Sequence, residues 1–115
     1  MKKIISLLIC ILLLTGCTSA YKTIDSNTAM ELIKNNAVVI DVRTAEEYNT
    51  GHVKESINIP VDNILSLDFD KDTTIIVYCA TGIRSANAAK MLIDAGYTNV
   101  YNLDGGLINW GAELE

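Results

Sequence analysis

Two short stretches of this chain consist almost wholly of apolar or β-branched residues, and they constrain the fold more than any other feature. They are residues 37–40 and 74–78. A strand without polar alternation is expected where both faces of a sheet are covered, which is typical of parallel sheets. Helical patterns separate these stretches from weaker strand candidates at residues 21–24, 57–59 and 99–101. The alternation predicts an α/β domain with a mostly parallel sheet of about five strands and helices on both faces.

Capping signals place the helices between these strands. Asp25 or Ser26 can cap the first helix, and Thr44 with Glu47 forms a capping box for a short one. The clearest helical pattern has small and apolar residues on one face and ends just before Gly96. We expect helices at residues 26–35, 45–51, 61–67 and 85–95. The whole chain of 115 residues has room for one such domain.

The first residues form a separate segment with the pattern of a secretory signal peptide. Lys2 and Lys3 precede an apolar run at residues 4–14, which is too short to span a bilayer comfortably. The sequence Leu-Thr-Gly-Cys that ends at Cys17 resembles the bacterial lipobox, in which the cysteine becomes the lipid-modified first residue. The resemblance implies cleavage of residues 1–16, lipidation of Cys17 and a protein held on a bacterial membrane outside the cytoplasm. Residues 17–22 would be a lipidated tether, and residues 23–115 the folded domain.

The charge and cysteine content exclude several classes of function. Nine Lys and Arg stand against fourteen Asp and Glu, and loss of Lys2 and Lys3 would leave seven, for a net charge of −7. A nucleic-acid-binding surface is therefore not expected. Cys10 would leave with the signal peptide and Cys17 would be blocked by lipid, so Cys79 would be the lone free thiol. No Cys/His cluster offers a metal site, and we expect neither a metal nor an organic cofactor.

Cys79 is the strongest candidate for a functional residue. It directly follows an apolar strand and precedes a predicted helix by a short loop. The backbone N–H groups of residues 80–84 can surround its sulfur, and both the helix N-terminus and Arg84 favour an anion there. These effects lower the pKa of a thiol and raise its thiolate fraction. Gly82 supplies the backbone freedom for such a loop. The alternative interpretation is a buried structural cysteine at a strand end.

Several ordered motifs at the proper spacing resemble those of the single-domain rhodaneses, which are thiosulfate or polysulfide sulfurtransferases. The family's active-site loop, Cys-x-x-Gly-x-Arg-Ser, is matched from Cys79 to Ser85. Glu55 departs from the pattern, because the family usually has glycine there. The other matches are Asp-Val-Arg at 41–43, Glu-Tyr at 47–48, Gly-His-Val at 51–53, Ile-Asn-Ile-Pro at 57–60, Gly-Tyr at 96–97, Val100, Leu-Asp-Gly-Gly at 103–106 and Trp110.

The resemblance implies a reaction with two half-reactions. Cys79 takes the sulfane sulfur of thiosulfate or a polysulfide, and a second nucleophile such as cyanide, a small thiol or a protein thiol removes it from the persulfide. Arg84 would hold the anionic donor, and Arg43 is a weaker candidate for the same role. The residues expected to form the active-site loop with Cys79 are Ala80, Thr81, Gly82, Ile83 and Arg84.

Two other functions compete with this interpretation. The first is a phosphatase or arsenate reductase, because related folds also combine a cysteine with a following arginine. Those loops place five residues between the two, whereas Cys79 and Arg84 have four between them, which suits a sulfur atom better than a phosphoryl group. The second is a binding or persulfide-relay module that acts only with a protein partner. The family's non-catalytic members typically lack the loop cysteine, so Cys79 argues against a purely binding role.

The remaining polar and aromatic residues in these motifs have simpler structural interpretations. We expect His52 to be structural, since an ionised Cys79 needs no general base. Asp41 is expected in an ion pair or turn, and Tyr48 and Trp110 in packing. The acidic residues between Leu67 and Thr73 resemble part of a calcium loop but lack its glycine and terminal glutamate.

Overall fold

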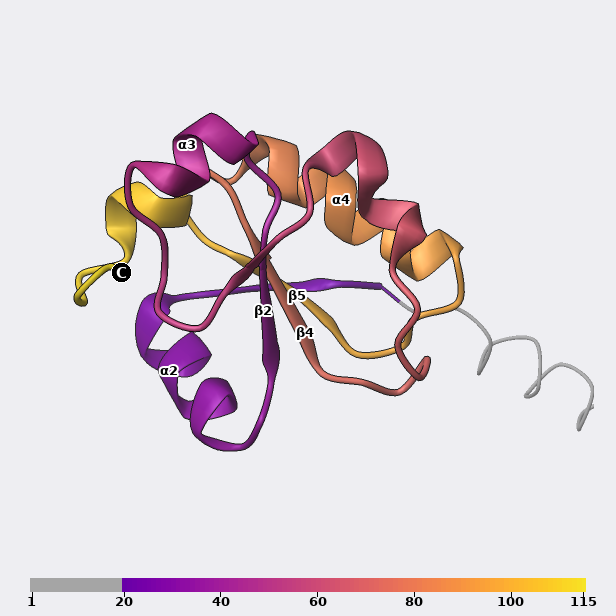
Figure 1. Ribbon diagram of the computed structural model, residues 1–115. Helices are drawn as coiled ribbons and strands as arrows, with labels where there is room; N and C mark the ends of the chain where they lie inside the picture. Colours follow the sequence, from indigo (N-terminus) through magenta and orange to yellow (C-terminus); the bar gives the residue numbers. More distant parts are fainter. Residues whose placement is uncertain (1–19) are drawn as a thin grey trace, which may run out of the picture.

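Five parallel strands form one sheet in the order β1-β5-β4-β2-β3 (Figure 1). The computed structural model describes residues 20–115. All four residues of β4 are buried, since the strand lies between β5 and β2 with helices over both faces. The prediction of a parallel five-stranded α/β domain is therefore confirmed. The strands are β1 (Lys22–Ile24), β2 (Val38–Asp41), β3 (Ile57–Asn58), β4 (Ile75–Tyr78) and β5 (Val100–Leu103).

The helices cover the two faces of the sheet unequally. In Figure 1, α3 and α4 lie on one side of the strands and α2 lies on the other. The longest helix within residues 20–115 is α4, which begins at Ile83, two residues before the predicted start. Gly82, in a left-handed conformation, already turns the chain into the helix. The helices are α2 (Ser26–Lys34), α3 (Ala45–Asn49) and α4 (Ile83–Asp94), with the 3-10 helices η1 (Val61–Ser66) and η2 (Gly106–Asn109).

The predicted caps are present and explain where two helices start. The Asp25 carboxylate accepts a hydrogen bond from the Thr28 N–H at 2.8 Å. At α3, the Thr44 side chain accepts from the Glu47 N–H while the Glu47 carboxylate accepts from the Thr44 N–H. This reciprocal arrangement fixes the direction of the Glu47 side chain.

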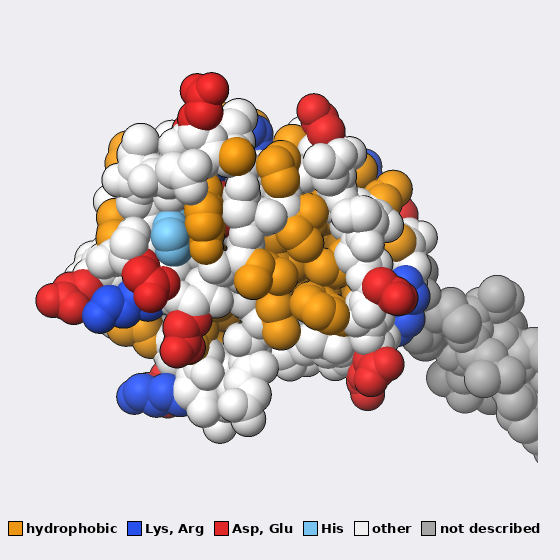
Figure 2. All heavy atoms as spheres, viewed as in Figure 1, with side chains coloured by type: hydrophobic (Ala, Val, Ile, Leu, Met, Phe, Trp, Pro, Cys, Tyr) orange, Lys and Arg blue, Asp and Glu red, His pale blue; other side chains and the backbone are white. Residues whose placement is uncertain are grey.

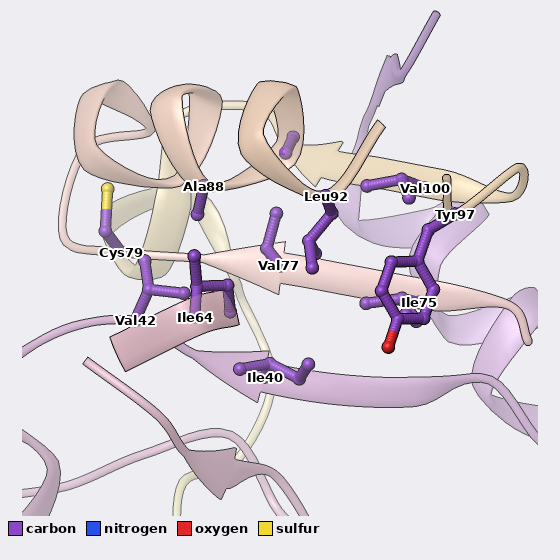
Figure 3. Packing of buried hydrophobic residues seen from close by; sticks show 11 residues of the cluster. Ile40, Val42, Ile64, Ile75, Val77, Cys79, Ala88, Leu92, Tyr97 and Val100 are labelled. Atoms are coloured by element: carbon purple, nitrogen blue, oxygen red, sulfur yellow. The ribbon is translucent and has the colours of Figure 1, made fainter. Parts of the chain in front are cut away.

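Alternation along each buried strand divides the hydrophobic core into two clusters. Ile75 and Val77 of β4 face α4 and η1, whereas Ile76 and Tyr78 face α2 and the C-terminal segment. Figure 3 shows the first cluster packed between the sheet and α4, with Cys79 at its edge. The core thus extends to Cys79 and fixes the strand end from which its thiol projects.

Glu55 occupies the turn before β3 in the conformation that glycine would adopt there. Its φ is +64°, in the left-handed region that side chains with a Cβ disfavour. The departure from the family pattern therefore leaves the turn in place and adds local strain.

The predicted signal peptide, the lipidation site at Cys17 and the start of the tether lie outside the described residues. Within residues 20–115, no helix is both long enough and apolar enough to cross a membrane.

Candidate active site

The carboxyl end of β4 places Cys79 at the centre of one edge of the sheet. Parallel strands bring their carboxyl ends together, and ligands bind to such sheets where these ends and their loops meet. In Figure 3 the sulfur lies beyond the end of β4, beside the first turn of α4. Cys79 is a free cysteine with only 1% of its surface exposed.

The loop between β4 and α4 points backbone donors at the Cys79 sulfur. The Gly82 N–H donates to Sγ at 3.1 Å, and the Ser85 N–H donates at 3.4 Å. The predicted role of Gly82 is confirmed by its φ of +101°, which few other residues adopt. A sulfur anion in this position gains both from the N–H groups and from the positive end of α4.

Burial and hydrogen bonding act in opposite directions on the Cys79 thiol. Burial raises its pKa, while hydrogen bonds from the Ser85 side chain and from the N–H groups of Ser85, Thr81 and Gly82 lower it. The net effect is a pKa below the ordinary value of a cysteine. The thiolate is the reactive form, so the loop favours nucleophilic attack by Cys79.

A buried chain of polar side chains leads from Cys79 across to β5. The Ser85 hydroxyl lies 3.4 Å from Sγ and donates to the Asn102 Oδ1 at 2.6 Å. The Asn102 amide nitrogen in turn donates to the Gly82 carbonyl at 3.3 Å, which orients the amide. Ser85 has one hydroxyl proton and two neighbours that can accept it, a thiolate and an amide oxygen. Asn102 therefore competes with the Cys79 thiolate for this proton.

The 3-10 helix η2 supports the loop from behind. The Leu107 N–H donates to the Cys79 carbonyl at 2.9 Å, and the Ile108 N–H donates to the Ala80 carbonyl at 3.2 Å. This close approach requires glycine at position 106, because a Cβ there would lie 2.4 Å from the Cys79 carbonyl oxygen. The Gly-Gly motif at 105–106 thus holds the loop in place by letting η2 approach it.

Arg84 reaches across to α3 and forms a two-pronged ion pair with Glu47. The two guanidinium nitrogens lie 2.7 Å and 2.9 Å from the two carboxylate oxygens. The hydrogen bond from Arg84 lowers the pKa of Glu47 to about 2, so the carboxylate is charged at neutral pH. Arg84 lies beside the loop as predicted, but its charge is already balanced.

Arg43 is held even more firmly by Asp41. Its Nη2 lies 2.7 Å from the Asp41 carboxylate and donates to the Gly51 carbonyl at 2.7 Å. Arg43 is 5% exposed and Asp41 is fully buried. The predicted contribution of Arg43 to anion binding gains no support from this geometry, because its side chain is engaged with protein groups. The interpretation of Asp41 as an ion-pair partner is confirmed.

The aromatic and histidine side chains of the family motifs have structural contacts, as expected. The His52 ring stacks on the Tyr48 ring with centroids 3.7 Å apart, and its Nδ1 lies 2.9 Å from the Tyr48 carbonyl. Trp110 packs in the cluster that faces α2. None of these contacts links the three residues to the Cys79 sulfur.

Three residues beside the loop were not predicted as part of the site. The sequence matches Ser85 only as the end of the loop motif, and Glu47 only as a helix cap and as part of the Glu-Tyr motif. Asn102 was missed, although an amide between Tyr101 and Leu103 in a buried strand is itself a signal. A polar side chain in such a strand needs a partner, and here the partner is the active-site loop.

Comparisons with known proteins agree with this geometry. The model of the rhodanese-like domain family matches residues 25–113. The thiosulfate sulfurtransferase GlpE of Shewanella oneidensis is 32% identical over 95 residues, covering 80% of this chain and 94% of that protein. GlpE of Ectopseudomonas mendocina is 39% identical over 98 residues, covering 82% of this chain and 88% of that protein.

A solved structure shows the same fold. The rhodanese-related protein of Thermoplasma volcanium has a TM-score of 0.74 and 32% identity, covering 83% of this chain and 98% of that one. The predicted rhodanese-type sulfurtransferase is thus confirmed at the level of the family. This chain belongs to the rhodanese-like domain family.

Proposed function

We propose that the protein transfers sulfane sulfur from thiosulfate or a polysulfide to a thiol, cyanide or a protein thiol through a persulfide on Cys79. The observation that carries the proposal is the position of the Cys79 sulfur, which receives N–H groups from Gly82 and Ser85 at the N-terminus of α4. The names of the GlpE relatives support thiosulfate as one donor.

In the first half-reaction the Cys79 thiolate attacks the terminal sulfur of the donor. A sulfur–sulfur bond forms to Sγ while the donor's own sulfur–sulfur bond breaks, and its electron pair leaves with sulfite or a shortened polysulfide. The product on the protein is a persulfide anion, which the same N–H groups stabilise. The thiol acceptor then attacks the outer sulfur and releases Cys79 as a thiolate, which gives ping-pong kinetics.

The geometry favours this reaction over phosphate ester hydrolysis. Cys79 lies almost wholly below the surface, so a donor must present a single protruding atom, as a terminal sulfur does. The two nearest loop N–H groups already point at Sγ, and the Arg84 guanidinium is occupied by Glu47. A phosphoryl group would need several free donors around its oxygens.

Replacement of Cys79 tests the proposed chemistry. The Cys79→Ser variant is expected to fold normally and to lose thiocyanate formation from thiosulfate and cyanide, because a serine hydroxyl is a far weaker nucleophile for sulfur. The wild type should give parallel double-reciprocal lines in the same assay. A Cys79→Ser variant with full activity would contradict the mechanism.

Two exposed side chains beside the loop favour a protein as acceptor. Ile83 is 74% exposed at the start of α4, and Ile108 is 77% exposed on η2. The backbone N–H of Ile108 donates to the Ala80 carbonyl of the loop. Exposed isoleucines next to a buried thiol suit the docking of another protein. In this second candidate function, a persulfide relay, turnover would be slow with every small acceptor and fast with the partner.

We also propose that Cys17 is lipidated after cleavage of residues 1–16 and holds the domain on a membrane outside the cytoplasm. The support is the apolar run behind Lys2 and Lys3 and the Leu-Thr-Gly-Cys sequence that ends at Cys17. The Cys17→Ser variant should leave the membrane fraction, whereas Cys10→Ser, within the cleaved segment, should not. Continued attachment of Cys17→Ser would mean that the uncleaved segment anchors the protein.

A further inference from the structure

Both arginines among the described residues have carboxylate partners near the active-site loop. Arg84 pairs with Glu47 through two hydrogen bonds, and Arg43 pairs with Asp41. Each pair sums to zero charge, so the Cys79 thiolate contributes a net negative charge to the site. The stabilisation of the sulfur anion thus comes from the backbone N–H groups, the Ser85 hydroxyl and the α4 N-terminus, without an unpaired guanidinium.

The lysines of residues 20–115 do not change this balance at the loop. Lys34 and Lys54 pair with Glu31 and Glu113, and Lys71 lies over the Tyr97 ring. The other two are Lys22 on the edge strand β1 and Lys90, two turns along α4 from its start. Figure 2 shows acidic side chains around the periphery of the face it displays, several of them beside a Lys or Arg, and residues 20–115 contain fourteen Asp and Glu against seven Lys and Arg. A dianion that approaches Cys79 therefore meets net repulsion at long range.

The partner of Arg84 is held in place by its own helix. The Glu47 Oε1 accepts hydrogen bonds from the Thr44 N–H and the Thr44 hydroxyl, each at 3.2 Å, in the capping box of α3. The carboxylate is therefore already oriented toward Arg84 and remains ionised at neutral pH. Glu47 has two functions: it caps α3 and it neutralises the arginine of the active-site loop.

We propose that Glu47 determines the donor class of this site, so that Cys79 takes sulfur from donors with a single negative charge, such as organic persulfides, in preference to the thiosulfate dianion. This inference rests on the proposed sulfurtransferase function. Glu47 acts through Arg84 and is a positioning residue.

Two donors that differ by one negative charge isolate the effect of donor charge on the rate of sulfur transfer. Thiosulfate is a dianion and leaves as sulfite, while methanethiosulfonate is a monoanion and leaves as methanesulfinate. Each gives its terminal sulfur to the Cys79 thiolate, and each reaction conserves charge and electrons as the donor's sulfur–sulfur bond breaks. Their intrinsic reactivities differ, so the informative quantity is how the ratio of their rates changes between proteins and salt concentrations.

The experiment measures the second-order rate of persulfide formation on Cys79 by mass spectrometry under single-turnover conditions. In the Glu47→Gln variant, Arg84 gains an unpaired charge, and the thiosulfate rate should rise about fivefold while the methanethiosulfonate rate rises about twofold. Gln also completes capping boxes, so α3 is retained. Glu46→Gln removes the same charge from the neighbouring residue without releasing Arg84, and should change the ratio of the two rates much less.

The wild type supplies a second test that does not depend on folding of a variant. Raising the ionic strength screens repulsion, so the thiosulfate rate should rise, and more steeply than the methanethiosulfonate rate. A thiosulfate rate that falls with salt, or a rate ratio unaltered by Glu47→Gln, would overturn the inference. If neither donor adds a sulfur to Cys79, it is the proposed function itself that fails.

Discussion

Two arginine–carboxylate pairs lie near the carboxyl end of the sheet, and they differ in burial and in the distance between partners along the chain. Asp41 and Arg43 are two residues apart, and both are buried. Glu47 and Arg84 are 37 residues apart, and each side chain keeps more than a third of its surface exposed. The first pair fixes the path of the chain after β2, while the second sets the charge beside the thiol. The same chemistry thus stabilises the fold in one place and tunes reactivity in the other.

The largest loss of stability is expected when the buried pair of Asp41 and Arg43 is broken. Asp41→Asn leaves the Arg43 charge buried without a counter-ion and turns an amide N–H toward donors that include the Tyr78 hydroxyl. We expect the free energy of unfolding to fall by about 3 kcal/mol or more, as measured by urea denaturation. A loss below about 1 kcal/mol would remove the distinction between the two pairs.

A third polar pair, Ser85 with Asn102, is buried but uncharged, and it extends the comparison to the thiol itself. Ser85→Ala should raise the pKa of Cys79, because the thiolate loses a hydroxyl donor. Asn102→Ala should lower that pKa, because the Ser85 hydroxyl proton is no longer shared with the amide oxygen. The pH dependence of iodoacetamide alkylation measures both effects.

The double variant separates competition for the proton from a general structural effect. If Asn102 acts only through the Ser85 hydroxyl, Asn102→Ala will not change the Cys79 pKa in a Ser85→Ala background. A further shift of the pKa in that background would mean that Asn102 influences the thiol by another route, such as its hydrogen bond to the Gly82 carbonyl.

Relief of the backbone strain at Glu55 should change the stability by a smaller amount, and should increase it. Glu55→Gly should raise the free energy of unfolding by about 0.5 kcal/mol, because relief of the left-handed strain exceeds the added flexibility of the unfolded chain. Asn36→Gly is the matched control, because the φ of Asn36 is +71° and asparagine tolerates this left-handed region better than glutamate does. In thermal unfolding, Asn36→Gly should therefore increase the stability less than Glu55→Gly. Equal gains at both positions would mean that residue type does not matter there.

The smallest expected effect on stability belongs to the exposed pair. Glu47→Gln should change the free energy of unfolding by less than about 0.5 kcal/mol at neutral pH. The pKa of Glu47 is lowered from 4.5 to about 2, so the stability from the pair is complete above pH 4.5 and is lost as the pH falls through about 2. The free energies of unfolding of the wild type and Glu47→Gln should therefore become equal in strong acid. A difference that grows as the pH falls would contradict the pairing of Glu47 with Arg84.

Local patterns in the sequence predicted the architecture and the position of the thiol. Strands without polar alternation indicated a parallel sheet, Asp25 and Thr44 marked two helix starts, and Cys79 lay at a strand end before a helix. Each of these inferences depends on residues that are close together in the chain. The start of α4 was misplaced by two residues because the left-handed turn at Gly82 continues directly into the helix.

Contacts between distant residues could not be predicted in the same way. Glu47 and Arg84 each had a sufficient local interpretation, Glu47 as a helix cap and Arg84 as an anion-binding residue of the loop. Their pairing depends on where the folded sheet places α3 relative to the first turn of α4, which no local pattern specifies. The approach of η2 to the Cys79 carbonyl is similar, since the need for Gly106 appears only when the two segments are in contact.

The most direct test of the central claim is the intact mass of the domain, beginning at Thr18, after incubation with thiosulfate and separately with polysulfide. We expect the addition of one sulfur atom, mapped to the peptide that contains Cys79 and removed by cyanide or a thiol. Absence of this adduct from folded protein with a reduced Cys79 would contradict the claim that this residue carries the transferred sulfur.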